Sequence, residues 1–248
     1  TDDRSETIHQ LVSMTRHEAR VTLELQNRPV SIIVDPLFDL FRRLDPSETP
    51  SSIGQLLGAK RSLVRLPSEA EPELREAYKE LADSWRNRTR RIRVVWDTTI
   101  KNIPNSGMVW ILGRENLLAD EFIQTTAGLP LSRNGNELRI GGQEFPLDQH
   151  SILLTSRRPN TIGWLHGSSV AAVAGLARKV PHYGKYSFLA FTGDSPDNVL
   201  KGQWPVVNSA LYHRLQAGVP QLQFPEHPPL SDQIGKEDPE QQIVSETD

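Results

Sequence analysis

The chain of 248 residues contains no cysteine. This absence excludes disulfide bonds, cysteine-ligated zinc, iron–sulfur clusters and catalysis by a thiol. It does not decide the compartment, because proteins without cysteine are stable in reducing and oxidising surroundings alike. The first residue is Thr1, with neither an initiating methionine nor a signal peptide before it. We therefore expect a processed protein or a piece of a longer one.

Long apolar runs and a strong net charge are missing as well. No apolar run reaches the roughly 18–20 residues that a membrane-spanning helix needs, so we expect no transmembrane segment. Lys and Arg total 28 against 31 Asp and Glu, which gives a formal net charge of −3. Since this charge is small and mixed in sign, we expect no nucleic-acid partner. The length is sufficient for a buried core.

The middle of the chain alternates short apolar runs with helical patterns. The clearest helical pattern covers 74–85, where apolar residues recur every three or four positions. It follows Ser68 and Glu71, whose spacing matches a capping box. Further helices are expected at 115–126 and 168–178. The expected strands are 62–66, 91–96, 108–112, 151–155, 161–165 and 186–191. This alternation predicts an α/β fold in which helices cover a mixed sheet.

The two ends of the chain differ from this middle part. Near the N-terminus, apolar runs at 20–25 and 30–34 flank a short polar stretch, which predicts a β-hairpin. Beyond Leu222 the composition is dominated by Pro, Glu, Asp and Gln, which cannot bury enough apolar surface to offset the entropy of ordering. We therefore expect three parts: an N-terminal hairpin and linker, an α/β domain, and a disordered acidic tail. Their expected boundaries are 1–50, 51–222 and 223–248.

The catalytic motifs in the chain are incomplete. His17 and Glu18 begin the zinc-binding pattern H-E-x-x-H, but Val21 stands where the second histidine is needed. No other pair of histidines has the spacing of metal ligands, and no glycine-rich nucleotide-binding motif follows a strand. We expect neither a metal site nor a bound cofactor, and no enzymatic activity of the isolated chain.

The first candidate site lies where a strand meets the alanine-rich helix. His166 and Ser168 occupy this junction, but the segment lacks the G-x-S-x-G pattern of a nucleophilic serine. In the structural interpretation, which we favour, Ser168 or Ser169 caps the helix. In the functional interpretation, the helix N-terminus receives an anion beside His166. His166 and Ser168 are therefore candidate ligand-binding residues.

The second candidate site lies at the start of the last expected strand. His182, Tyr183 and Lys185 follow one another there, and Lys201 and Trp204 form another polar and aromatic pair farther on. Open α/β sheets bind ligands at strand ends where polar groups converge. These five residues are therefore our main ligand-binding candidates. The alternative is a lid in which the aromatic side chains of this region, including Tyr186, pack over the sheet.

A basic cluster lies between the clearest helix and the next expected strand, at Arg86, Arg88, Arg90, Arg91 and Arg93. Such a cluster can bind phosphates. It can equally offset the exposed carbonyls at the C-terminus of a helix. Because the chain as a whole is slightly acidic, we favour the structural interpretation.

Two stretches resemble bacterial aminopeptidases of the M1 (gluzincin) type. Residues 34–44 resemble a segment downstream of the catalytic region in such proteins, while 181–186 and 201–204 are similar to their far C-terminal part. The zinc motif of the family and its distant glutamate ligand have no match here. The resemblance therefore implies a non-catalytic accessory domain of a larger bacterial peptidase-like protein, in the periplasm or cell envelope, with the catalytic domain upstream in the same polypeptide.

Three hypotheses for function follow from these observations. The leading one is the accessory or binding domain that the resemblance implies. The alternative is a small-ligand-binding or enzymatic α/β domain that uses His182, Tyr183 and Lys185, where a neutral histidine and a lysine could act as base and acid. The third is a purely structural or protein-interaction module.

Overall fold

The computed structural model describes residues 8–36, 39–86, 91–99, 102–157, 160–205, 209 and 211–215. The chain divides into two units: Leu44–Val207 forms one, and Thr1–Arg43 together with Asn208–Asp248 forms the other. The tail that we expected to be disordered, 223–248, lies outside the described residues. No helix of the described part is both long and apolar enough to span a membrane.

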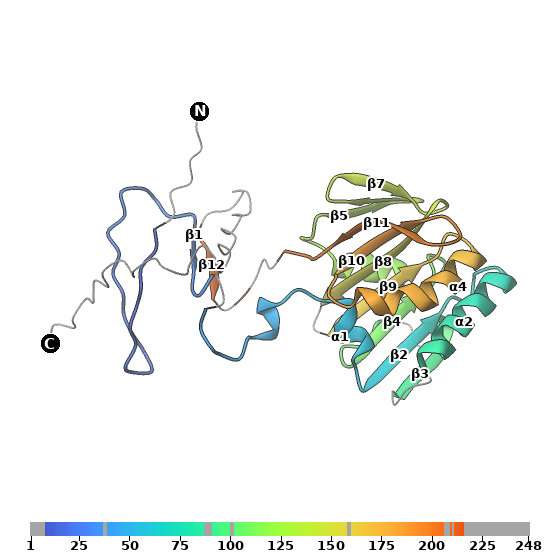
Figure 1. The fold of residues 1–248 in the computed structure, drawn as a ribbon, viewed down its shortest axis with the longest axis horizontal. Coiled ribbons are helices and arrows are strands. Elements are labelled where there is room, and N and C mark those ends of the chain that lie inside the picture. The colour runs from blue at the N-terminus through green and yellow to red at the C-terminus, as the bar shows by residue number, and fades with distance from the viewer. Residues whose placement is uncertain are drawn as a thin grey trace, which may run out of the picture. The chain divides into compact units, whose positions relative to one another are not determined.

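A seven-stranded mixed sheet runs through the Leu44–Val207 unit (Figure 1). The strand order is β11-β10-β8-β9-β4-β2-β3. Four neighbouring strands are parallel, namely β2 (Arg61–Leu66), β3 (Arg91–Trp96), β4 (Met108–Leu112) and β9 (Thr161–His166). Antiparallel pairing then adds β8 (His150–Arg157), β10 (Phe188–Thr192) and β11 (Asp197–Gly202). The predicted α/β class with a mixed sheet is confirmed.

Helices and a second small sheet cover the two faces of this sheet. One face is covered by α2 and α4, which lie side by side (Figure 1), together with α1 and the short 3₁₀ helix η3. The other face is covered by α3 and by the antiparallel sheet β5-β6-β7. The bounds of these elements are α1 (Ile53–Leu57), α2 (Pro72–Arg86), α3 (Ala119–Thr125), α4 (Val170–Lys179), η3 (Val180–Tyr183), β5 (Leu131–Asn134), β6 (Glu137–Ile140) and β7 (Gln143–Pro146).

Two hydrophobic cores result, one on each face of the sheet. Side chains alternate between the faces along each strand. Trp110 and Leu165 therefore point into the core beneath α2 and α4, while their neighbours Ile111 and Trp164 point into the core beneath α3. Because the central strands are buried on both faces, they are continuous apolar runs, as is typical of parallel sheets.

The N-terminal strand pair is present, but its second strand comes from elsewhere in the chain. Strand β1 (Ser31–Ile33) pairs antiparallel with β12 (Tyr212–Arg214), whereas 20–25 has no regular secondary structure. The apolar side chains at 20–25 stay exposed, and an isolated hairpin without a buried face is marginal. A hydrogen bond from the amide of Val34 to the carbonyl of Leu211, at 2.8 Å, extends the β1–β12 ladder.

Candidate functional site

The carboxyl edge of the parallel strands is where open α/β sheets bind ligands. Strands β4 and β9 are neighbours, but β4 leads to α3 on one face and β9 leads to α4 on the other. Such a divergence of the connections marks the place where open α/β sheets bind ligands. His166 and Ser168, our first two candidates, lie at the end of β9, and Glu115 lies just after β4.

His166 is almost completely buried, with 2% of its surface exposed. Its Nε2 donates a hydrogen bond to the carbonyl of Leu147 at 2.6 Å, so Nδ1 is the nitrogen without a proton. The ring stacks on Trp164, with 6.1 Å between centroids. Burial lowers the pKa of His166 to about 4. At neutral pH the side chain is therefore an uncharged member of the core.

The serines after His166 are used in the local structure. Ser169 caps α4, because its Oγ accepts a hydrogen bond from the amide of Ala172 at 3.1 Å. The amide of Ser168 donates to Oγ of Ser151 at 3.0 Å, and the amide of Gly167 donates to another hydroxyl. The capping interpretation is thus confirmed for Ser169. The amides of Gly167, Ser168 and Ala172 at this turn are thus bonded to protein hydroxyls.

Two further buried side chains join the ends of the strands. Asp97, which is 1% exposed, follows β3 and accepts hydrogen bonds from the amides of Ser68 (3.2 Å) and Leu117 (2.9 Å). The capping box predicted at Ser68 and Glu71 is wrong, because α2 begins only at Pro72, a residue suited to the first helical position. The sequence analysis did not single out Asp97, although a polar residue directly after an apolar strand was a signal for it.

Asn116 performs the same role after β4. Its Nδ2 donates to the carbonyls of Arg65 and Leu112, both at 3.0 Å, and its Oδ1 accepts from the amide of Leu118 at 3.1 Å. These bonds hold 114–118 in a turn, so α3 begins at Ala119 and not at the expected residue 115. The carboxyl edge thus uses most of its polar groups to connect strands β2, β3 and β4.

Two buried atoms at this edge have no hydrogen-bond partner among the described residues, Oε2 of Glu115 and Nδ1 of His166. The other carboxylate oxygen of Glu115 accepts from Nε of Arg114 at 3.0 Å. The charge of Glu115 opposes the effect of burial on His166, since it favours the protonated ring. With His166 neutral, both atoms are hydrogen-bond acceptors.

The second group of candidates lies at the opposite edge of the sheet. Strand β10 runs parallel to β9, since both are antiparallel to β8. The residues before β10, which include His182, Tyr183 and Lys185, therefore lie at the amino edge of the parallel strands. The structure does not bring them together with His166 and Ser168.

Two lysines converge on one aromatic ring at this amino edge. Nζ of Lys185 lies 5.2 Å from the centroid of Tyr186, and Nζ of Lys201 lies 5.8 Å from the same centroid. The ring of Tyr183 is 6.0 Å from that of Tyr186. We call these four residues the Tyr186 surface. Both lysines are exposed, and both tyrosines are half-buried.

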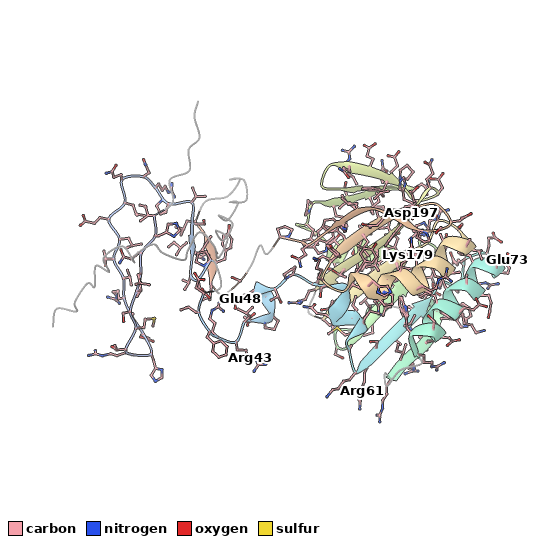
Figure 2. The ribbon with its side chains drawn as sticks, in the orientation of Figure 1. Arg43, Glu48, Arg61, Glu73, Lys179 and Asp197 are labelled. Atoms are coloured by element: carbon pink, nitrogen blue, oxygen red, sulfur yellow. The ribbon has the colours of Figure 1, made fainter. Side chains whose placement is uncertain are left out.

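The charges of the Tyr186 surface are not balanced locally. Within the described part of the chain, neither Lys185 nor Lys201 forms an ion pair. Lys179 of α4 behaves differently, because it pairs with Asp197 of β11 at 3.3 Å (Figure 2). Two ammonium groups on one ring, without a carboxylate, favour the approach of an anion.

The backbone beneath the Tyr186 surface is held from two sides. On one side, the first amides of α1 donate to the loop: Ile53 to the carbonyl of Tyr186 (2.9 Å) and Gly54 to that of Gly184 (2.7 Å). On the other side, Nε2 of Gln203 donates to the carbonyl of Lys185 at 2.8 Å. The loop is therefore fixed before any ligand binds, which lowers the entropic cost of binding.

A buried polar network supports the same loop. Oγ of Ser51 and Oγ1 of Thr155 are 2.9 Å apart, and Oγ of Ser187 donates to the carbonyl of Ser51 at 2.5 Å. The amide of Thr155 donates to the carbonyl of Ser187 at 2.8 Å. This network could not be predicted from the sequence, because Ser51 lies more than a hundred residues before both of its partners in the chain.

The remaining candidates of this group take other positions. Trp204 is 4% exposed, packs against Phe188 at 4.4 Å between centroids, and donates from Nε1 to the carbonyl of Thr155 at 2.6 Å. It belongs to the core beneath α3, whereas Tyr183 and Tyr186 pack on the core beneath α2 and α4. A single lid of all three aromatic residues is therefore not formed. His182 is exposed.

An open depression of about 340 Å³ lies between α3 and the small sheet, lined by Asp120, Ile123, Arg133 and Gly135. None of the candidate residues lines it. Across the described residues, no three side chains of the His, Asp and Glu type are grouped so that they could hold a metal ion.

Comparisons with protein-family models, curated proteins and solved structures give no match.

Proposed function

We propose that the Leu44–Val207 unit is a non-catalytic binding module whose Tyr186 surface recognises a carboxylate group on a partner polypeptide. The observation that carries this proposal is the convergence of Lys185 and Lys201 on one ring, at 5.2 and 5.8 Å, without an ion pair to a described residue. A carboxylate between the two ammonium groups removes their mutual repulsion and gains the attraction of both.

The arrangement of the carboxyl edge supports a non-catalytic role. In an enzyme of this architecture, the polar groups after the parallel strands are available to the substrate. Here the side chains of Asp97 and Asn116 form hydrogen bonds with backbone groups of the same fold. Asp97 and Asn116, two polar side chains at the usual ligand edge, therefore act as connections within the fold.

We further propose that the module accompanies a catalytic domain in a larger peptidase-like protein. The support is the resemblance of 34–44, 181–186 and 201–204 to the downstream part of M1-type aminopeptidases. All four residues of the Tyr186 surface lie within 181–186 and 201–204, which connects the resemblance to the binding proposal. The coding sequence upstream of Thr1 provides the test: an H-E-x-x-H motif is expected there, and a different domain would contradict this part of the proposal.

Binding is tested by the fluorescence anisotropy of a labelled hexaglutamate peptide. The variant Lys185→Gln/Lys201→Gln should bind this peptide at least about tenfold more weakly than the unmodified chain, because the close charge pairs are lost. The matched control, Lys60→Gln/Lys79→Gln, removes the same charge from exposed positions elsewhere and should bind almost normally. Equal weakening in both variants would show that only net charge matters and would reject the Tyr186 surface.

A further inference from the structure

Three exposed arginines gather on the first two strands of the parallel sheet. Arg61 on β2 lies directly opposite Arg91 on β3 in the strand register, and Arg93 is two residues farther along β3. Figure 2 shows Arg61 where β2 begins, beside the start of β3. Side chains two residues apart share one face of a strand. The three guanidinium groups therefore extend from one face of the sheet.

This face is the one turned away from α2. Ile92 and Val94 alternate with the arginines along β3 and pack on the core beneath α2 and α4. The other face of the sheet is covered by α3 and the small sheet, but their core is built on β4, β8, β9 and β10. Arg61, Arg91 and Arg93 lie outside that cover and are exposed.

The three arginines form no ion pair with a described residue. Like charges directly opposite each other destabilise a sheet, so this arrangement costs free energy unless an anion binds. The structural interpretation of the basic cluster applies to Arg86, which lies in the last turn of α2 and pairs with Asp83 at 3.2 Å. It does not apply to Arg91 and Arg93, which belong to a strand. Arg88 and Arg90 lie outside the described residues.

The spacing of these arginines fits a compact anion. Neighbouring strands are about 4.8 Å apart, and residues i and i+2 of one strand are about 6.6 Å apart. Three guanidinium groups on such a small triangle can reach two or three adjacent phosphates, whereas a nucleic-acid duplex requires a longer track of cations. One guanidinium group can donate two parallel hydrogen bonds to two oxygens of a phosphate, which makes the contact strong and fixes its orientation.

From this geometry we propose that Arg61, Arg91 and Arg93 form a binding site for a compact polyphosphate, that is, a diphosphate or triphosphate group. This site is separate from the Tyr186 surface, which lies on the other half of the sheet beside β10 and β11. The two proposals therefore succeed or fail independently.

The probe is inorganic tripolyphosphate, titrated into the full chain by calorimetry and in thermal melts. Tripolyphosphate should bind and raise the melting midpoint, because it binds only the folded state. The variant Arg61→Gln/Arg91→Gln/Arg93→Gln should bind at least tenfold more weakly, and its affinity should depend less on salt. The control Lys79→Gln/Arg86→Gln/Arg139→Gln loses the same charge from positions that are ion-paired and should keep the affinity within about threefold.

Several outcomes overturn this site. The site is rejected if the unmodified chain does not bind tripolyphosphate, or if the two triple variants are weakened equally. It is also rejected if Lys185→Gln/Lys201→Gln loses tripolyphosphate binding. Single-stranded oligonucleotides are a further test. If they bind more tightly than tripolyphosphate, and more tightly the longer they are, the ligand is a nucleic acid and the proposal of a compact polyphosphate is rejected. If the triple variant does not fold, Arg93→Gln alone serves, since Arg93 has no arginine directly opposite. It should weaken binding at least threefold, and unchanged binding would reject the site.

Discussion

The amide of Gly167 donates a hydrogen bond to the hydroxyl of Tyr78 across 2.9 Å. This bond joins the turn after β9 to the middle of α2, and both partners are buried. Burial raises the pKa of Tyr78 above its usual value, so its hydroxyl stays protonated. In nucleotide-binding sheets the corresponding amides bind phosphate. Here a tyrosine of the same chain takes that position, which makes the turn part of the fold.

Replacing Tyr78 by phenylalanine should therefore destabilise the protein. The substitution keeps the ring in the core but leaves the buried amide of Gly167 without an acceptor, which costs about 1–3 kcal/mol. Urea denaturation measures the change. Tyr183→Phe is the control, because the Tyr183 hydroxyl forms no hydrogen bond with the residues that the structure describes, and it should change stability by less than about 0.5 kcal/mol. Equal effects of the two substitutions would contradict the role given to Tyr78.

His166 should make the stability of the protein depend on pH below neutrality. Its pKa is about 4 in the folded protein, whereas an exposed histidine titrates near 6.5, so protons bind preferentially to the unfolded chain. Above pH 6.5 the ring is neutral in both states and His166 causes no pH dependence. As the pH falls from 6.5 to 4, the free energy of unfolding decreases by about 3 kcal/mol through this residue.

Chemical denaturation between pH 7.5 and 4 tests this expectation. His166→Gln should be less stable at neutral pH, because the stacking on Trp164 is lost, but its stability should fall less between pH 6.5 and 4. If both proteins lose the same free energy over this interval, the pH dependence comes from other groups.

Local sequence patterns predicted most of the sheet. The strands expected at 91–96 and 108–112 form with those bounds: both are short runs with β-branched residues, and in the first of them arginines alternate with apolar residues. The predicted start of α3, residue 115, was wrong. The periodicity of apolar residues cannot reveal that the side chain of Asn116 accepts a hydrogen bond from the amide of Leu118. The partner of β1 could not be predicted either, because it lies about 180 residues downstream and pairing at such a distance depends on the tertiary structure.

The candidate site was predictable in composition but not in arrangement. Lys185 and Lys201 were both selected from the sequence, but the antiparallel pairing of β10 with β11 is what brings them to one ring. Tyr186, the centre of the surface, was expected only as a packing residue. Trp204 was selected because it adjoins polar residues, yet it lies two residues beyond β11 with its side chain buried in the core beneath α3. Register is not visible in a single sequence.

The carboxylate of Asp97 should be among the most costly to remove. Asp97→Ala leaves the amides of Ser68 and Leu117 without acceptors and takes a negative charge from beside the buried Arg65, so we expect a loss of about 3–5 kcal/mol. Asp97→Asn keeps one acceptor oxygen and should lose less. Denaturation midpoints of the two variants provide the measurement, and an asparagine variant as unstable as the alanine variant would show that charge alone matters.

Two glycines that face each other beneath the Tyr186 surface should respond differently to alanine. A Cβ on Gly54 would lie 2.8 Å from the carbonyl oxygen of Gly184, which is too close for any real contact and involves backbone on both sides. A Cβ on Gly184 would meet its nearest atom at 3.5 Å, an ordinary contact, and the helical conformation of Gly184 suits any residue. Gly54→Ala should therefore cost roughly 1–3 kcal/mol. Gly184→Ala should be neutral or stabilise by up to about 1 kcal/mol, because it restricts the unfolded chain.

The same pair of variants tests whether the loop must be held in place for binding. Gly54→Ala pushes α1 away from the carbonyls of Gly184 and Tyr186, and thereby shifts the loop that carries Lys185. We expect it to weaken hexaglutamate binding at temperatures where the protein is still folded, whereas Gly184→Ala binds normally. If Gly54→Ala is destabilised but binds as well as the unmodified chain, the lysines find their partner without a fixed backbone. Preorganisation would then have no part in recognition at the Tyr186 surface.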